Sequence, residues 1–387
     1  LRPRRQRQMC IRDSLLYFLY MDYKLTQSNR IDSTPFTSRN ALAGVSSYTI
    51  YNKTLLPTIF NSYEEDYYHL INHVQMWDVS CQKIIEIKGT DALNFLRYVS
   101  CRNFETIDKF KCYYTPMTDF DGGLLNDTLV YSIDEETIWV SISDSDMFMW
   151  FSGLLVNLNF NVKVKNKKIY TLALQGPKAI KLTEELIDKK FLSLPFFSFD
   201  FFDFKNTRVL VSKTGYSKQG GFEFLFDNAK IACEFWDFLI KEGKPFNIKV
   251  GCPNMIERVE NSLLSYGNDM TSKDTPYDCS LGKYCSIDMS YDFIGKVALT
   301  NYVKNKQKRN IYRVFFGDND LKIKSKLKCY HEKKEIGDIT SIIFSPKYKK
   351  NMGFIIAYEK DILIDNSNNY FVKTEYGLIE AKISNFS

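Results

Sequence analysis

The sequence predicts an α+β protein with an all-β region at its C-terminal end. Residues 22–300 mix apolar patterns of helical spacing with alternating runs, whereas residues 301–387 contain mostly short alternating runs separated by turns. The chain has 387 residues, which is enough for two or three domains with their own cores. We therefore divide it into residues 1–21, 22–300 and 301–387.

Residues 1–21 are excluded from the predicted fold. Residues 1–14 hold five arginines and one aspartate, so they carry four of the six net positive charges. The remaining charge of about +2 gives no strong case for a nucleic-acid partner. The apolar run Leu15–Met21 is too short to span a bilayer, and no small-residue cleavage site follows it. We interpret residues 1–21 as a non-native leader, and we expect no membrane partner.

The cysteines and histidines predict neither a disulfide framework nor a metal site. Nine cysteines are scattered along the chain without a C-x-x-C pair, and Cys279 and Cys285 are six residues apart. His69 and His73 have the i, i+4 spacing of metal ligands, but no carboxylate–His motif lies beside them. Reduced thiols are typical of a cytoplasmic protein, so we expect that location.

Turn residues divide the chain into predicted helices and strands. Asp119–Gly123 predicts a hairpin turn, and Asp91 is expected to cap the helix that follows it. The predicted helices are 64–74, the segment after 91, 144–156, the segment from 178, and 231–241. The predicted strands are 47–52, 83–88, 111–114, 124–131, 137–143, 162–164, 171–174, 208–213, the strand returning to 224, 310–316, 338–344 and 352–358.

The stretch Gly251–Cys285 is the one around which we organise the chain. Pro253 suits the first turn of a helix. Ile256, Val259, Leu263 and Leu264 would share one apolar face of that helix. Gly267 and Asn268, which both tolerate positive φ, would then end the helix. Taken alone, the pattern predicts an amphipathic helix with a capping loop.

Part of this stretch resembles the central region of the glycine-cleavage T-protein family, through the run IERVENSLLSYGNDM…TPYDCSLGKYC. These proteins are tetrahydrofolate-dependent aminomethyltransferases, and the run is still more similar to the family's dimethylsulfoniopropionate demethylase branch. Residues 335–346 are similar to the family's C-terminal barrel signature. The resemblance implies a T-protein-like folate-binding fold of three subdomains. Two of them would intertwine in residues 22–300, and a β-barrel domain would occupy residues 301–387.

Gly122–Asp127 forms the first motif that bears on chemistry. On the residues alone, Asp127 is either a site carboxylate or a strand-start residue that bonds nearby backbone. The family has Gly-Gly-x-x-Asp-Asp here, and its second Asp lies at the reactive N5 of folate. The resemblance therefore implies that Asp127 is both catalytic and cofactor-binding. Asn126 replaces the first Asp, as it does in the demethylase branch.

Thr214–Glu223 forms the second motif and, taken alone, reads as a glycine-rich hairpin. The family has Gly-Tyr-Thr-Gly-Glu-Asp-Gly-x-Glu here, which Gly215, Tyr216, Gly221 and Glu223 match. The resemblance implies that Glu223 accepts hydrogen bonds from the pterin ring, since a carboxylate offers two acceptors side by side. Tyr216 is also assigned to the cofactor.

Arg258 matches an arginine of the family and is the last predicted cofactor-binding residue. It can instead pair with Glu257 or Glu260 on its own helix. Asn254 stands where aminomethyltransferases have an arginine that holds folate, and the demethylase branch shares this asparagine.

A sulfonium substrate needs a pocket for a soft cation, and an aromatic face attracts such a cation by about 2 kcal/mol when desolvated. We assign Tyr216, Tyr51 and Ser141 to substrate binding. Tyr113 and Tyr114 are weaker aromatic candidates. Core packing is the alternative for each of these rings.

The resemblance implies methyl transfer from dimethylsulfoniopropionate to tetrahydrofolate, giving methylmercaptopropionate and 5-methyltetrahydrofolate. A sulfonium methyl is already electrophilic, so no metal or covalent nucleophile is needed. Positioning can supply about 7–11 kcal/mol, and Asp127 would stabilise the positive charge that develops on N5. Two alternatives stay open: an aminomethyltransferase or related N-methyl amine demethylase, and a non-catalytic folate-binding protein. A homodimer is compatible with each.

Overall fold

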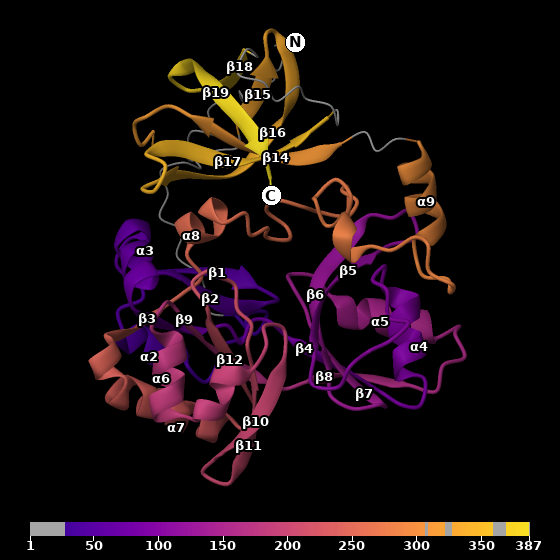
Figure 1. Cartoon of the computed structure of the whole chain (residues 1–387), viewed down its shortest axis with the longest axis vertical. Helices are drawn as coiled ribbons and strands as arrows, with labels where there is room; N and C mark the ends of the chain where they lie inside the picture. Colours follow the sequence, from indigo (N-terminus) through magenta and orange to yellow (C-terminus); the bar gives the residue numbers. More distant parts are fainter. Residues whose placement is uncertain (1–27, 306–308, 322–326, 359–368, 387) are drawn as a thin grey trace, which may run out of the picture.

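The computed structural model describes residues 28–305, 309–321, 327–358 and 369–386. Two sheets lie side by side in the lower part of the molecule, and a closed barrel lies above them (Figure 1). This architecture confirms the predicted α+β class and the C-terminal β-barrel. The predicted leader, residues 1–21, lies outside the described residues.

The first sheet has six strands in the order β10-β11-β12-β9-β3-β13, and helices cover one of its faces. Phe224 and Phe226 of β12 pack on Phe235 of α7, with ring centroids 5.0 and 5.2 Å apart. The strands are β3 (Val74–Asp78), β9 (Tyr170–Gln175), β10 (Phe199–Phe204), β11 (Thr207–Ser212), β12 (Gly221–Phe226) and β13 (Ile248–Gly251). The helices around this sheet are α2 (Thr37–Leu42), α3 (Tyr63–Asn72), α6 (Ala179–Leu186), α7 (Ala229–Glu242), η1 (Lys189–Ser193) and η2 (Lys244–Phe246).

The second sheet has five strands in the order β5-β6-β7-β4-β8 and is inserted, in sequence, between β3 and β9 of the first. Its outer face packs against α4 and α5. Its elements are β4 (Ile84–Lys88), α4 (Ala92–Val99), β5 (Cys112–Thr118), β6 (Leu124–Ser132), β7 (Thr137–Ser141), α5 (Met147–Leu155) and β8 (Lys163–Lys167). A separate two-stranded sheet consists of β1 (Ser47–Tyr51) and β2 (Thr54–Ile59).

The inner faces of the two large sheets contact each other. Leu210 and Leu225 of the first sheet share one apolar cluster with Ile84 and Tyr131 of the second. Side chains alternate between the faces of a strand, so the residues beside Leu225 in β12 point to the helices while Glu223 points to the other sheet. The same alternation puts Asp127 of β6 on the face that carries Tyr131.

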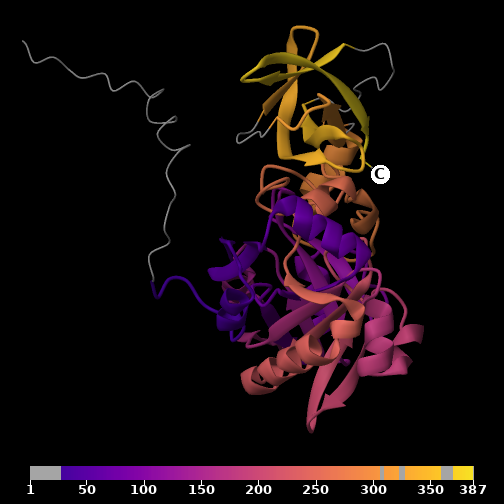
Figure 2. The ribbon, with the colours of Figure 1, turned by 90° about the vertical axis from the view of Figure 1, so that its left-hand side faces the viewer.

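The barrel closes in the order β14-β17-β16-β15-β18-β19 and lies beyond one end of the two sheets (Figure 2). Its strands are β14 (Asn310–Phe316), β15 (Leu327–His331), β16 (Lys334–Ser345), β17 (Lys350–Ala357), β18 (Tyr370–Thr374) and β19 (Gly377–Asn385). The predicted division at residue 301 falls inside α9 (Lys296–Lys304), which precedes the barrel. The division of the chain into domains stays a prediction.

The helix predicted in the stretch Gly251–Cys285 is shorter than expected. It forms α8 (Met255–Glu260), and the short helix η3 (Gly282–Tyr284) follows later. Asn254 caps α8, and Ser262 adopts a positive φ of 57° just beyond its end. The predicted apolar stripe is therefore wrong, because Leu263 and Leu264 lie outside the helix. Residues 256–260 are all buried, since α8 packs against α3, β16 and β17.

The predicted cap of α4 is also wrong in its contacts. Asp91 does occupy the N-cap position, but its carboxylate accepts from the backbone of Asn161 at 2.8 Å and from the side chain of Asn94 at 3.2 Å. This aspartate joins α4 to the loop before β8. The other predicted elements are present, with ends that differ by a few residues.

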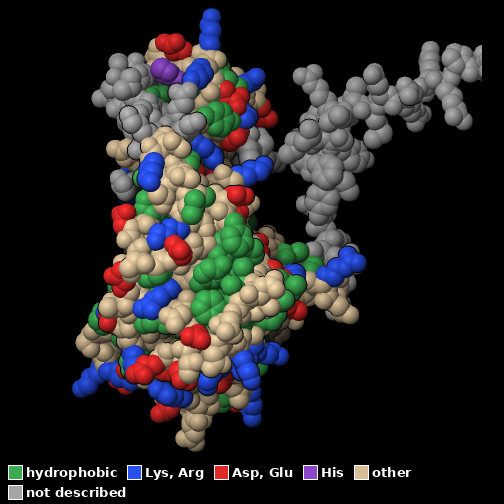
Figure 3. Space-filling model, turned by 90° about the vertical axis from the view of Figure 1, so that its right-hand side faces the viewer, with side chains coloured by type: hydrophobic (Ala, Val, Ile, Leu, Met, Phe, Trp, Pro, Cys, Tyr) green, Lys and Arg blue, Asp and Glu red, His purple; other side chains and the backbone are tan. Residues whose placement is uncertain are grey.

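One face of the molecule carries a group of exposed apolar side chains. Figure 3 shows them on the side that bears α4, α5 and α9. Phe120 and Met149 have exposed side chains, and the ring of Phe120 contacts that of Trp150 of α5. None of the described helices is long and apolar enough to cross a membrane.

Candidate active site

Asp127 lies on β6 with one carboxylate oxygen engaged and the other without a partner. Oδ2 accepts a hydrogen bond of 2.8 Å from the Tyr114 hydroxyl on neighbouring β5. Oδ1 is buried and has no hydrogen-bond partner among the described residues. Burial raises the pKa of Asp127 to about 6, and the hydroxyls of Ser143 and Tyr114 offset part of this rise. Asp127 is thus a half-buried residue whose carboxylate keeps one buried oxygen as a free acceptor.

Tyr51 and Ser143 lie beside this carboxylate. Burial raises the pKa of Tyr51, the charge of Asp127 adds to the rise, and Ser143 opposes it. The Ser143 hydroxyl is 3.5 Å from the backbone oxygen of Asp127. Ser141, the predicted serine, pairs with Leu129 on β6, on the face that carries Asp127. The structure therefore adds Ser143 to the predicted pair of Tyr51 and Ser141.

Tyr216 is held by the loop after α8. Its hydroxyl donates to the backbone oxygen of Leu264 at 2.6 Å. Burial raises its pKa. Arg258 opposes that rise, whereas the charges of Asp269, Asp127 and Glu257 add to it. The charge of Asp127 therefore acts on the Tyr216 hydroxyl.

Arg258 is buried, and three hydrogen bonds tie its guanidinium to the protein. Nη1 donates to Asp269 at 2.8 Å and to the backbone oxygen of Leu263 at 3.0 Å, and Nη2 donates to Ser341 of β16 at 2.5 Å. The alternative of an ion pair with Glu257 or Glu260 is not met, because the partner is Asp269. Arg258 ties α8, its following loop and the barrel together beside Tyr216.

Glu223 lies on β12 and points between the two sheets. It is buried, and it accepts a hydrogen bond from the Thr214 hydroxyl. Burial raises its pKa, and Thr214 offsets part of the rise. Its charge adds to the rise that burial causes in the pKa of Tyr131 on the opposite sheet. Since Tyr131 and Asp127 lie on one face of β6, Glu223 and Asp127 face the same space between the sheets.

Two residues of the predicted motifs have structural roles instead. A Cβ on Gly123 would come within 2.2 Å of the backbone oxygen of Ser272, so this glycine permits close packing of two loops. Asn254 caps α8 and donates to the backbone oxygen of Tyr63 at 2.9 Å.

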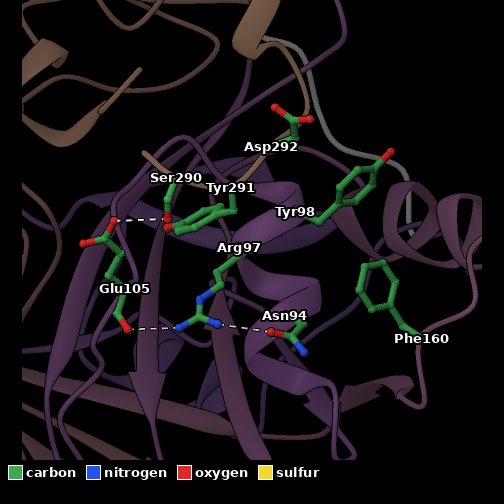
Figure 4. A pocket seen from close by; sticks show the side chains of 8 residues that line it. All are labelled: Asn94, Arg97, Tyr98, Glu105, Phe160, Ser290, Tyr291 and Asp292. Atoms are coloured by element: carbon green, nitrogen blue, oxygen red, sulfur yellow. Dashed lines mark hydrogen bonds between the residues drawn. The ribbon is translucent and has the colours of Figure 1, made fainter. Parts of the chain in front are cut away.

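A pocket of about 420 Å³ lies elsewhere, between α4 and residues 290–292 (Figure 4). Its central Arg97 donates to the backbone oxygens of Phe104 and Glu105 and to the side chain of Asn94. None of the predicted site residues lines this pocket. We place the active site at Asp127 instead.

Sequence reasoning missed Ser143 and Glu257, and it weighed Tyr114 only as an aromatic ring. The predicted hairpin contained a signal for Tyr114, since its two strands form the β5–β6 pair. In that register Asp127 lies opposite Pro116, two residues from Tyr114. Glu257 gave no such signal, because a charged residue on a short helix usually faces solvent.

Comparison with known proteins identifies the family of the chain. The profile of the GCVT N-terminal domain matches residues 39–289, which is more than half of the chain. The chain belongs to the glycine-cleavage T-protein family. This confirms the family predicted from the motifs.

Individual relatives of the GCVT family are similar along most of their length. Dimethylsulfoniopropionate demethylase DmdA from Ruegeria pomeroyi is 36% identical over 325 residues, covering 84% of this chain and 89% of that protein. An aminomethyltransferase from Thermotoga neapolitana is 30% identical over 311 residues, covering 78% and 84%. The crystal structure of glycine cleavage system aminomethyltransferase T from Bartonella henselae has a TM-score of 0.81 at 17% identity, covering 92% of this chain and 98% of that one. This last likeness supports the fold.

Proteins of the GCVT family are folate-dependent transferases, and tetrahydrofolate is the predicted cofactor that membership confirms. The residues present fit such a ligand. The unpartnered Oδ1 of Asp127 is an acceptor that a ligand can satisfy, and the buried carboxylate of Glu223 faces the same space. Buried polar atoms are normally hydrogen-bonded, so an orphaned oxygen at this place indicates a ligand.

Proposed function

We propose that the chain transfers a methyl group from dimethylsulfoniopropionate to tetrahydrofolate. The S–CH₃ bond breaks with its electron pair left on sulfur, which gives the neutral thioether methylmercaptopropionate. Tetrahydrofolate supplies the nucleophilic N5, which gains the methyl, loses its proton and becomes 5-methyltetrahydrofolate. The protein's task is to hold the two reactants in line.

The observation that best supports this proposal is the state of Asp127. Its Oδ2 is fixed by Tyr114 while Oδ1 is buried and free. A carboxylate held in this way is preorganised to stabilise a positive charge, and it needs no reorganisation when that charge develops. The 36% identity to a dimethylsulfoniopropionate demethylase supports the choice of methyl donor.

The remaining predicted residues take roles around Asp127. Glu223 is proposed to accept from the pterin, and Tyr51 and Ser141 to contact the methyl donor. Tyr216 is proposed to contact both reactants. Arg258, whose guanidinium binds Asp269 and the carbonyl of Leu263, is proposed to act on folate indirectly by fixing the loop that holds Tyr216.

An aminomethyltransferase is the second candidate, favoured by the relative from Thermotoga neapolitana. Asn254 argues against it, since this asparagine caps α8 where an arginine would hold folate. A non-catalytic folate-binding protein is the third candidate. We place any of these activities in the cytoplasm.

One assay distinguishes the three candidates. Purified protein is incubated with tetrahydrofolate and, separately, with dimethylsulfoniopropionate, with N-methyl amines, and with an aminomethyl-loaded lipoyl carrier. Mass spectrometry then follows the folate product. We expect 5-methyltetrahydrofolate with the sulfonium donor. Turnover only with the lipoyl carrier would support the second candidate, and no turnover with any donor would support the third.

A further inference from the structure

Glu257 is a buried carboxylate on α8 that the proposed reaction has not yet used. It is 1% exposed. Its Oε1 accepts hydrogen bonds from the backbone of Lys218 at 2.8 Å and from the side chains of Gln219 and Asn261, each at 2.9 Å. Its Oε2 is buried and has no hydrogen-bond partner among the described residues. Three hydrogen bonds thus fix Oε1, whereas Oε2 remains a free acceptor.

The charges around Tyr216 do not balance. Glu257 lies near Tyr216, since its Oε1 accepts from the backbone of Lys218, two residues further along the chain. Burial raises the pKa of the Tyr216 hydroxyl, the guanidinium of Arg258 opposes the rise, and the carboxylates of Asp269, Asp127 and Glu257 add to it. Arg258 is paired with Asp269 at 2.8 Å. Neither Asp127 nor Glu257 forms an ion pair within the described part of the chain. Two carboxylates therefore remain without a cation around one aromatic residue.

A buried carboxylate is costly unless a positive charge or a full set of donors accompanies it. The neighbouring charge of Glu260 increases this cost for Glu257. Asp127 and Glu257 also share a pattern, since each has one oxygen held by the protein and one oxygen left over. A single cationic ligand beside Tyr216 would compensate both, and the aromatic face would add to the attraction.

We propose that Glu257 is a specificity-determining residue that, together with Asp127, selects a methyl donor carrying an onium charge. The proposal rests on the methyl transfer proposed above, and it names the chemical feature that the site recognises. A sulfonium and a quaternary or protonated N-methyl amine both fit this class. A neutral molecule of the same shape does not.

The test compares two ligands that differ in charge and little in shape. Dimethylsulfoniopropionate carries a sulfonium, and 4-methylpentanoate has a neutral carbon in its place. Dissociation constants for both are measured by calorimetry on the full chain, as wild type, as Glu257→Gln and as Glu260→Gln. Glu260 is a matched control, since it is a buried carboxylate of the same helix whose two oxygens both have partners.

We expect wild type and Glu260→Gln to prefer the cation. Glu257→Gln should lose about tenfold or more of that preference, while its affinity for tetrahydrofolate stays within about twofold. The amide oxygen can keep the three donors of Oε1, so the variant should fold with an unchanged or higher Tm. Glu257→Met removes the charge with an apolar side chain of similar length and gives a second measurement should the first variant fail to fold.

Two results would overturn the assignment. One is a cation preference unchanged in both Glu257 variants. The other is a loss of folate affinity with the cation preference intact, which would place Oε2 against folate. A third result separates the assignment from the proposed function. If wild type binds dimethylglycine but no sulfonium, and Glu257→Gln loses dimethylglycine, the methyl donor is wrong and the role of Glu257 is supported.

Discussion

Four carboxylates near α8 and its following loop form two pairs with opposite environments. Asp269 and Glu260 have both oxygens engaged. Asp269 accepts from Arg258 and the backbone of Ser265 on one oxygen and from Thr340 and Ser341 on the other. Glu257 is as deeply buried and Asp127 is half-buried, yet each keeps one buried oxygen without a partner among the described residues.

The difference follows from what each pair connects. The partners of Asp269 and Glu260 include residues of β16 and its following turn, so these two acids fasten the barrel to the rest of the protein. Asp127 and Glu257 are held by neighbours on one oxygen only, near Tyr216. The carboxylates whose two oxygens both have hydrogen-bond partners thus have a structural role. Those with one unpartnered oxygen lie at the proposed ligand site. The predictions below test this distinction.

The largest effect is expected for Asp269→Ala. The substitution leaves the buried guanidinium of Arg258 without its counter-charge, and breaking a buried ion pair in this way costs about 3–5 kcal/mol. Tm and the midpoint of urea unfolding should both fall clearly. Asp292→Ala is the control, because Asp292 is 96% exposed and pairs with Lys296 only at the surface. If both variants unfold alike, Asp269 does not fasten the barrel.

Asp127→Asn should instead reduce catalysis. The substitution preserves shape but removes the charge that we assign to the transition state, so kcat should fall by about 10²–10³. Folate affinity should change far less, because the effect lies in the chemical step.

Stability gives an independent check on Asp127. Burial raises its pKa from 3.8 to about 6, so the folded state binds its proton more tightly than the unfolded chain does. The wild type should therefore lose stability at this residue as pH rises from about 4 to 6, and the variant should not. At pH 7 the Tm of Asp127→Asn should equal or exceed that of wild type. A lower Tm with normal kcat would mean that Asp127 only supports its strand.

Glu223→Gln should have a smaller effect, on folate binding. One acceptor oxygen becomes an amide that faces the N–H groups of the pterin, and a lost charge-assisted bond contributes about 1.5–3 kcal/mol. The dissociation constant for tetrahydrofolate should rise tenfold or more in calorimetry. Glu234→Gln, on the outer helix α7, is the control, and equal affinities in the two variants would remove Glu223 from the site.

The sequence predicted the elements of this site better than their environment. Strand alternation and turn residues located β6 and β12, so Asp127 and Glu223 could be placed on strands from local pattern alone. The stretch 255–264 was harder. Its apolar spacing continued to Leu264, but Ser262 turns the backbone at a positive φ, and Tyr216 binds the carbonyl of Leu264.

Contacts distant in sequence explain what pattern could not provide. The alternative for Arg258, an ion pair with Glu257 or Glu260, considered only neighbours in sequence, and residues one and two positions apart do not face each other on a helix. Its real partner, Asp269, lies across a loop, and Ser341 comes from the barrel. The free oxygen of Glu257 is a property of the whole environment, which no local spacing encodes.

The smallest effect is expected for Tyr114→Phe, and it appears in the pH profile. Tyr114 donates to Oδ2 of Asp127 at 2.8 Å, which favours the ionised carboxylate and lowers its pKa. Removing the hydroxyl takes this contribution away, so the pKa of Asp127 should rise above its value of about 6. Since the ionised form is the one that we assign to catalysis, activity falls as pH decreases through this pKa. The acid limb of kcat against pH should therefore move upward by about one unit, the scale of one hydrogen bond of about 0.5–1.5 kcal/mol, while kcat at pH 8.5 stays within about threefold.

Tyr113→Phe is the matched control, because the Tyr113 hydroxyl accepts from the backbone of Asp108 and does not touch Asp127. A profile that moves equally in both variants, or in neither, would show that Tyr114 does not set the ionisation of Asp127.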